Sequence, residues 1–190
     1  RRIFLKSPPR SDIVIFDEEN SYPISMYILE DLPYFIFNVR PEKIYISPSI
    51  IINYFISLKY FRIHTKSRKS KALLALLQLR HCYHFACLMT IKPKIVITFI
   101  DNSTDFHWLS RYYKNASFFA IQNGIRTNNE LNSLKNKKFY LQHYFCFGNY
   151  EESQFNKHEL LVKNFYPIGS LLSGYYQFNK NNNIKFRYDI

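Results

Sequence analysis

The fold is set by two segments near the middle of the chain: IVITFIDN at residues 95–102 and SFFAIQNGIR at residues 117–126. Each is a run of apolar, β-branched or aromatic residues that ends abruptly in polar ones. In a parallel α/β sheet this pattern is typical of a buried strand with functional groups at its carboxyl end, where ligands of open α/β sheets bind. Residues 103–116 are long enough for one crossover helix. The centre of the chain is therefore predicted to be a β-α-β unit with two polar strand ends side by side.

On either side of this unit, strand and helix patterns alternate. Further strands are predicted at residues 12–17, 34–39, 43–46, 139–147 and 166–170, helices at 25–31, 66–89 and 151–158, and a polar loop at 127–138. The segment Ser49–Phe61 is apolar at nearly every position, so it is predicted to be a buried helix or a further strand, and its length favours the helix. Alternation of this kind predicts an α/β fold, a Rossmann-like parallel sheet with helices on both faces.

The composition is that of a globular protein, with 47% hydrophobic and 18% aromatic residues available for a core. A formal net charge of +12 has two explanations. It can mark a surface that faces nucleic acid, an acidic membrane or a phosphorylated substrate. Alternatively, the abundance of Asn, Lys, Ile, Phe and Tyr with few Gly residues is what an AT-rich genome encodes whatever the function.

Three cysteines, Cys82, Cys87 and Cys146, lie among apolar or aromatic neighbours and form no C-x-x-C pair. They are predicted to be buried free thiols of a reducing compartment. The sequence has neither a membrane-span pattern nor the apolar core of a signal peptide. We expect a cytoplasmic protein, with peripheral attachment to the inner membrane as an alternative. The basic segment Arg62–Lys71 could face that anionic membrane surface, or it could be the solvated start of a helix.

Both ends of the chain are interpreted as cut. It begins with Arg1-Arg2 rather than Met, and the polar residues 179–183 precede IKFRYDI at 184–190, a pattern typical of a new strand. The expected organisation is a Rossmann-like N-terminal, acceptor-side domain at residues 1–178, followed at residues 179–190 by a linker and the start of a truncated second domain.

Several enzyme classes are excluded by missing motifs. The sequence has no G-x-G-x-x-G fingerprint, P-loop or nucleophile elbow, which argues against dinucleotide-binding and P-loop enzymes. His81 and His84 could share a metal on one helix, but no carboxylate or cysteine completes a ligand set at suitable spacing. No metal site is therefore predicted, and both histidines are interpreted as hydrogen-bonded within the fold or facing solvent.

The segment after the second central strand carries the sharpest candidates. A glycine at Gly124 permits an unusual turn and lets a ligand approach the main chain. Gln122 and Asn123 can exchange hydrogen bonds with sugar hydroxyls, and Arg126 can grip a phosphate or carboxylate through its fork of donors. The alternative is an ordinary Asn-Gly turn.

The neighbouring strand ends add further candidates. Asp101 could act as a general base, or it could merely precede a helix that Asn102 or Ser103 caps. Gly169 and Ser170 end the last predicted strand, where the serine could cap a helix or bind a ligand. Each is compatible with a structural turn, but together they predict a cleft at the carboxyl edge of the sheet.

The order of these features resembles the N-terminal half of bacterial surface-carbohydrate biosynthesis proteins with a GT-B glycosyltransferase-like architecture. The shared features are strand ends at Asp101-Asn102, at Gln122-Asn123-Gly124 and at residues 147–151, each followed by a helix or loop, and then the turn at residues 167–170. Related polysaccharide transferases have a Gln/His-Gly strand end and an x-x-Gly-Ser turn in the same order. The resemblance covers residues 12–173.

This resemblance implies the N-terminal domain of a GT-B-type two-domain architecture, with the active site between two Rossmann-like domains. The N-terminal domain would favour the acceptor, and the nucleotide-sugar donor is expected in the missing domain, so this fragment would bind no cofactor. The residues that match the pattern are Asp101, Asn102, Gln122, Asn123, Gly124, Arg126, Gly169 and Ser170.

The leading hypothesis is a glycosyltransferase of lipopolysaccharide, O-antigen or capsule assembly, which transfers a sugar from a nucleotide-sugar to a glycan or lipid-linked acceptor. The fragment alone is expected to be inactive. One alternative is a nucleotide-sugar epimerase of GT-B shape, and another is a non-catalytic, basic nucleic-acid-binding α/β domain. The dispersed lysines and arginines, without a recognised DNA- or RNA-binding signature, argue against nucleic acid.

Overall fold

The computed structural model describes residues 2–19, 21–28, 31–39, 43–60, 68–136 and 139–181. Its centre is a six-stranded sheet in the order β3-β2-β5-β6-β7-β8, in which every neighbouring pair is parallel. The strands are β2 (Ile13–Phe16), β3 (Phe35–Phe37), β5 (Ile95–Thr98), β6 (Ser117–Ile121), β7 (Tyr140–Cys146) and β8 (Leu161–Pro167). The predicted Rossmann-like parallel sheet, with the central β-α-β unit inside it, is thus confirmed.

The chain reverses its direction of travel across the sheet once. From β2 it moves to β3 at one edge, returns to β5 on the other side of β2, and then adds β6, β7 and β8 in order. The switch point of the topology therefore lies between β2 and β5. In open α/β sheets, ligands bind outside the carboxyl ends of the strands at such a point.

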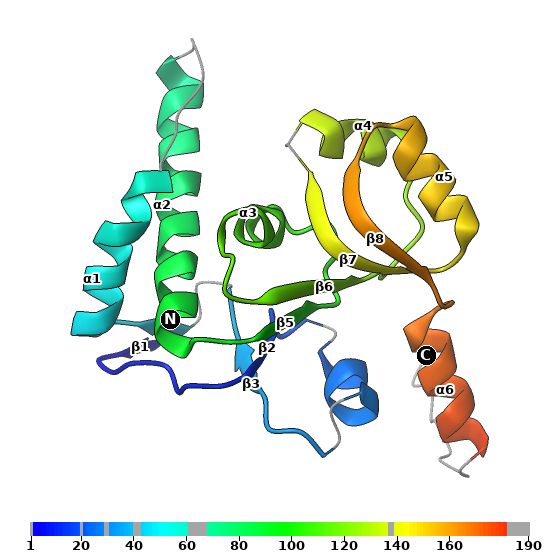
Figure 1. Cartoon of the computed structure of the whole chain (residues 1–190), viewed down its shortest axis with the longest axis horizontal. Helices are drawn as coiled ribbons and strands as arrows, with labels where there is room; N and C mark the ends of the chain where they lie inside the picture. Colours follow the sequence, from blue (N-terminus) through cyan, green and yellow to red (C-terminus); the bar gives the residue numbers. More distant parts are fainter. Residues whose placement is uncertain are drawn as a thin grey trace.

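Helices cover both faces of the sheet, but unequally (Figure 1). One face carries α1 (Pro48–Ser57), α2 (Arg68–Ile91), α3 (Thr104–Tyr112), α4 (Asn128–Asn136) and α5 (Asn149–Lys157). The other face carries the π-helical turn η1 (Ile24–Ile28) and α6 (Leu171–Asn181). The predicted arrangement of helices on both faces is confirmed, and the helix expected at residues 25–31 corresponds to the helical turn Ile24–Ile28, which begins one residue earlier.

The core consists of two layers because side chains of a strand alternate between its faces. Val14 and Phe16 of β2 join the large layer under the five helices, whereas Ile13 and Ile15 join the smaller layer under η1 and α6. All four residues of β2 are buried. Burial of each such side chain stabilises the fold by about 1.5–3 kcal/mol, so this continuous apolar run favours an interior position for β2, between β3 and β5.

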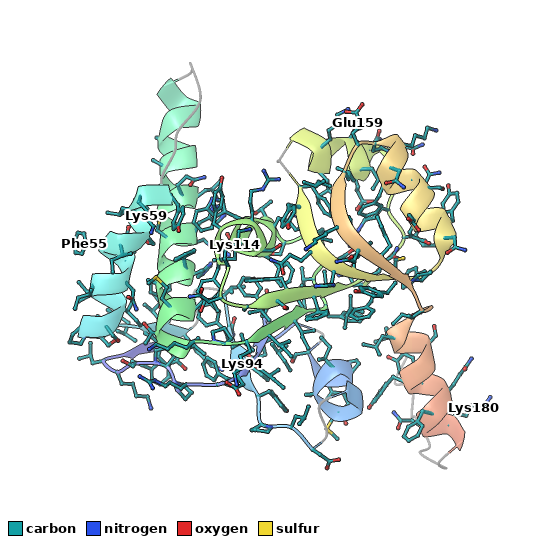
Figure 2. The ribbon with its side chains drawn as sticks, viewed as in Figure 1. Phe55, Lys59, Lys94, Lys114, Glu159 and Lys180 are labelled. Carbon is teal, nitrogen blue, oxygen red and sulfur yellow. The ribbon has the colours of Figure 1, made fainter. Side chains whose placement is uncertain are left out.

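The prediction for Ser49–Phe61 is right about the helix and wrong about its burial. Helix α1 begins at Pro48 behind the N-cap Ser47, and Ile50 packs into the core with 3% of its surface exposed. On its other side the apolar residues Ile51, Ile52, Phe55 and Ile56 are 43–66% exposed. Figure 2 shows Phe55 on the side of α1 that faces away from α2. Among the described elements, α1 packs mainly against α2, so the opposite face of α1 is left uncovered by the described residues.

The predicted polar loop at residues 127–138 is wrong, because Asn128–Asn136 form α4. Thr127 and Glu130 make a capping box: the backbone N–H of Glu130 donates to Oγ1 of Thr127 at 3.3 Å, and the backbone N–H of Thr127 donates to Oε2 of Glu130 at 2.8 Å. Leu131 and Leu134, one turn apart, are buried. These two signals are present in the sequence despite the polar composition around them.

Three other segments differ from the prediction. The strand expected at residues 43–46 is β4 (Lys43–Tyr45), but it pairs with the unpredicted β1 (Arg2–Phe4) in a separate two-stranded sheet. The strand expected at residues 166–170 is observed as β8 at residues 161–167. Its sequence is not a continuous apolar run, in keeping with its position at the edge of the sheet. Helix α6 was not predicted, and its end overlaps the polar residues 179–183.

Some predictions fall outside the described residues. The strand expected at residues 184–190 is one of them, and so is most of the basic segment Arg62–Lys71, of which residues 68–71 open α2 without described side chains. The three cysteines are buried free thiols, as predicted. Within the described residues, no helix combines the length and apolarity required to cross a membrane.

Candidate functional site

The candidate site lies at the carboxyl ends of β5, β6 and β7, next to the switch point. The residues that follow β5 and β6 are joined there by hydrogen bonds to each other and to β7. They divide into a buried frame and an exposed surface. Asp101, Gln122, Arg126 and Tyr144 form the frame, whereas Asn102 and Asn123 are exposed.

Asp101 is the centre of the frame and has only 2% of its surface exposed. Its Oδ2 accepts a hydrogen bond from the Tyr144 hydroxyl at 2.8 Å, and its Oδ1 is paired with the guanidinium of Arg126. The main-chain oxygen of Asp101 accepts a hydrogen bond from Nε2 of His107 in α3 at 2.7 Å. The residue is therefore held on every side in this conformation, and both carboxylate oxygens face protein groups.

The protonation of Asp101 reflects two opposing effects. Burial raises the pKa of its carboxyl group, and the Arg126 charge and the Tyr144 hydrogen bond counteract part of that rise. Burial also raises the pKa of Tyr144, and the nearby Asp101 carboxylate adds to that rise. Tyr144 thus remains a hydroxyl donor at neutral pH, which is the form that the hydrogen bond to Asp101 requires.

Arg126 links the frame to the exposed surface. Its guanidinium pairs with Asp101 and donates a hydrogen bond to Oδ1 of Asn123 at 2.7 Å. Only 9% of its side chain is exposed, and its Nε is buried without a hydrogen-bond partner among the described residues. Because a buried guanidinium without its carboxylate would be costly, Asp101 and Arg126 fix each other.

Gln122 ties the loop after β6 to the neighbouring strand. Its Oε1 accepts the backbone N–H of Phe147 at 2.8 Å, and its Nε2 donates to the backbone oxygen of Gly124 at 3.0 Å. With 1% of its surface exposed, it faces no ligand directly. A side chain placed at Gly124 would meet no atom within 4 Å, so open space lies above the main chain there.

Asn102 and Asn123 are the polar side chains that this frame presents to solvent. Helix α3 is capped by Ser103, whose Oγ accepts the backbone N–H of Phe106 at 3.3 Å, so the cap does not use Asn102. Oδ1 of Asn123 is held by Arg126, which fixes the orientation of its amide group. The result is a pair of amides at neighbouring strand ends, suited to hydrogen-bonding hydroxyl groups.

The remaining predicted residues lie further along the sheet. Gly169 follows β8, two strands from β6, and has a φ of 87°, a conformation that favours glycine. The Oγ of Ser170 accepts the backbone N–H of Ser173 at 3.2 Å and so caps α6. The structure thus brings Asp101, Asn123 and Arg126 into contact, whereas Gly169 and Ser170 form the turn into α6.

A hollow of about 340 Å³ opens at the carboxyl end of β2, the neighbour of β5. It lies between the segment that follows β2 and α6, and Tyr22, Tyr175, Tyr176 and Glu18 are among the residues that line it. The rings of Tyr22 and Tyr175 meet edge to face with centroids 5.8 Å apart. Aromatic walls with a carboxylate nearby suit a ligand that has both an apolar face and hydroxyl groups.

The two histidines considered for a metal share Asp105 instead. Nε2 of His81 lies 2.8 Å from Oδ1 of Asp105, Nδ1 of His84 lies 3.6 Å from Oδ2, and Arg80 pairs with the same carboxylate at 2.6 Å. Burial lowers the pKa of His84 to about 4. Within the described part of the chain, no group of three or more His, Cys, Asp or Glu residues is arranged to hold a metal ion. This cluster joins α2 to α3.

Tyr144 is the site residue that sequence reasoning missed. It lies in an aromatic strand, where nothing distinguishes it from the neighbouring rings, and only the packing of β7 beside β6 brings its hydroxyl to Asp101. Glu18 and Tyr22, in the segment after β2, are likewise absent from the predicted site residues, because only the packing of α6 beside this segment forms the hollow that they line. Comparison of the chain with protein-family models, curated proteins and solved structures finds no match in any of the three.

Proposed function

We propose that this chain is the acceptor-side domain of a GT-B-type glycosyltransferase of surface-polysaccharide assembly, and that the carboxyl edge of its sheet binds the sugar acceptor. The observation that carries the proposal is the pair of exposed amides, Asn102 and Asn123, on a buried hydrogen-bonded frame next to the switch point. Ligands of open α/β sheets bind at this place. The amide of Asn123, which Arg126 holds in a fixed orientation, is a selective partner for sugar hydroxyls, and the exposed amide of Asn102 adds donors and an acceptor beside it.

In this proposal Asp101 is a positioning residue. A general base must reach the proton that it removes, and both oxygens of Asp101 are engaged by Tyr144 and Arg126. Asp101 holds Arg126, and Arg126 in turn orients the amide of Asn123. The tyrosine-lined hollow at the end of β2 supports the same proposal, because the apolar face of a sugar ring packs on aromatic side chains.

The test is a titration of the chain with mono- and oligosaccharides, with and without a phosphoryl group. Asn102→Ala and Asn123→Ala are expected to weaken saccharide binding about tenfold each, as the loss of one or two hydrogen bonds predicts. Asn129→Ala, an exposed amide on α4, is the matched control and is expected to bind normally. Saccharide binding that both site variants leave unchanged would exclude this edge as the acceptor site.

A second experiment separates the glycosyltransferase from the epimerase and nucleic-acid alternatives. The parent protein and this chain are titrated with UDP-, GDP-, CDP- and CMP-sugars, and the transfer of sugar to a bound saccharide is measured. Binding by the parent alone, with transfer that Asn123→Ala reduces, supports the proposal. Release of free nucleotide without an acceptor favours the epimerase, and salt-sensitive binding to RNA or DNA favours the nucleic-acid domain.

A further inference from the structure

A second and larger hollow opens at the amino-terminal ends of the strands, where β2 and β5 begin, opposite the candidate site. Its volume is about 750 Å³. The segment before β2 supplies Ser7 and Arg10, the start of α1 supplies Ser49, and the turn between α2 and β5 supplies Lys92 and Lys94. Among the described residues that line this hollow, none is acidic. The volume falls within the range of small-molecule sites.

The cations of this hollow are only partly neutralised. Lys94, labelled in Figure 2, pairs with Asp12 at 2.8 Å, and both side chains are mostly exposed. Arg10 and Lys92 have no ion-pair partner among the described residues. Two unpaired cations on the wall of one hollow raise the local concentration of anions.

Hydroxyl groups surround the same space. Oγ of Ser7 donates a hydrogen bond to Oγ of Ser47 at 2.9 Å, and Oγ of Ser49 lies 3.1 Å from that of Ser7 and 3.0 Å from that of Ser47. Because hydroxyl groups rotate, Ser7 and Ser49 can turn a hydrogen toward an anion in the hollow. Met89 and Tyr113 add an apolar wall to this polar one.

Lys92 occupies a backbone conformation that disfavours any side chain. It directly follows α2 with a φ of 60°, and its backbone N–H donates to the oxygen of Leu88 at 2.8 Å. Glycine is the common residue at this point of a helix end, because the left-handed conformation is strained for residues with a Cβ. Strain of this kind is typical of functional positions, where the side chain provides something that glycine lacks.

We propose that this hollow binds a soluble phosphate ester, with its phosphoryl group held by Arg10, Lys92 and the hydroxyls of Ser7 and Ser49. Arginine offers two parallel donors to phosphate oxygens, and lysine adds a compact charge. The rest of the ligand lies against Met89 and Tyr113. This site is independent of the acceptor edge, because it lies at the opposite ends of the strands.

The test is calorimetric titration of the chain with pyrophosphate and with a sugar phosphate, together with urea unfolding. Lys92→Gly is expected to weaken binding about tenfold, because it removes a contact with the phosphoryl group. It is also expected to raise the free energy of unfolding, because glycine adopts the positive φ at this position without strain. Opposite changes in the two measurements separate a lost ligand contact from a damaged fold. Arg10→Gln is expected to weaken binding to a similar extent.

Lys157→Gln, on α5 and outside the lining of this hollow, is the matched control and is expected to bind as the unmodified chain does. The proposal is overturned if neither probe binds at millimolar concentration. It is also overturned if Lys157→Gln weakens binding as much as Lys92→Gly, since the anion would then be attracted by the overall positive charge of the chain and not by this hollow. Binding to phosphatidic acid vesicles without binding to either soluble probe would assign the basic surface to a membrane instead.

Discussion

The Tyr144 hydroxyl in β7 donates a hydrogen bond at 2.8 Å to the Asp101 carboxylate beyond the end of β5, and so reaches past the intervening strand β6. Tyr144→Phe would leave Oδ2 of a buried carboxylate without this donor. We expect a loss of about 2 kcal/mol in the free energy of unfolding, the typical value for a hydrogen bond to a charged group. Urea denaturation measures it, with Tyr150→Phe, 67% exposed, as the control. Equal stability of the two variants would mean that the hydrogen bond to Asp101 contributes nothing.

Gln122 offers a second test of the frame. Gln122→Leu is similar in size but leaves the backbone N–H of Phe147 and the backbone oxygen of Gly124 without their present partners. An unsatisfied buried polar group costs about 1–3 kcal/mol, and because both groups are only partly buried, water can replace a lost partner, so we expect a loss near the lower end of that range. Hydrogen exchange of the Phe147 amide should accelerate together with the loss of stability. An unchanged exchange rate would contradict the role assigned to Oε1 of Gln122.

The capping box of α4 predicts a difference between two substitutions of one residue. Thr127→Ala removes the oxygen that accepts the backbone N–H of Glu130, and it should destabilise the protein by about 1 kcal/mol. Thr127→Ser keeps that oxygen and should remain close to the unmodified chain. Thermal unfolding of the pair is the measurement. If serine and alanine gave the same transition temperature, residues 128–136 would not depend on this cap.

Helix α1 predicts opposite results for neighbouring apolar residues. Ile50→Ala, with 3% of Ile50 exposed, should cost about 2–5 kcal/mol, because it empties a packed position. Ile52→Ser and Phe55→Ser, at 60% and 66% exposure, should change the free energy of unfolding by less than about 0.5 kcal/mol. Denaturant unfolding of the three variants decides between these expectations. Large losses at residues 52 and 55 would show that this face is covered in solution.

The buried His84 predicts a loss of stability in acid. Burial holds its pKa at about 4, below the ordinary value near 6.5, although Asp105 attracts a proton to it and Arg80 and His81 oppose one. Between about pH 4 and pH 6.5, the imidazole of His84 is protonated in the unfolded chain but neutral in the folded one. Stability is therefore complete above about pH 6.5 and falls, by roughly 3 kcal/mol, as the pH decreases toward 4. The free energy of unfolding, measured by denaturant titration at several pH values in this range, should fall more steeply with decreasing pH for the unmodified chain than for His84→Leu. The same pH dependence in both chains would refute the assignment.

The sequence was sufficient to predict the parallel sheet because its central strands are continuous apolar runs that end in polar residues. IVITFIDN at residues 95–102 has this pattern, and β5 lies where it predicts. The two-stranded sheet was missed because β1 is three residues long and pairs with a strand some 40 residues away. Pairing between distant short strands depends on tertiary packing, which local pattern does not contain.

The candidate site was likewise predicted in part, where its residues follow a local sequence pattern, and missed where they depend on tertiary packing. Asp101, Asn123 and Arg126 were found because strand ends are recognisable in sequence, and the chain brings them together. Their division into buried frame and exposed surface was not predictable, since it depends on Tyr144 reaching across a strand. Likewise, Asp105 became the shared partner of His81 and His84 only through the packing of α3 on α2.

The pairing of β2 with β5 has a kinetic consequence. Ile15 pairs with Ile97, about 80 residues along the chain, whereas β5, β6 and β7 each pair with the next strand in the chain. Closing a long loop costs more chain entropy than closing a short one, and folding slows as contacts become less local. Residues 95–167 should therefore assemble first as successive β-α-β units, and β2 should dock onto the exposed edge of β5 in the slower step. Until it docks, that edge is an open template for pairing with another chain, so aggregation during refolding should begin there.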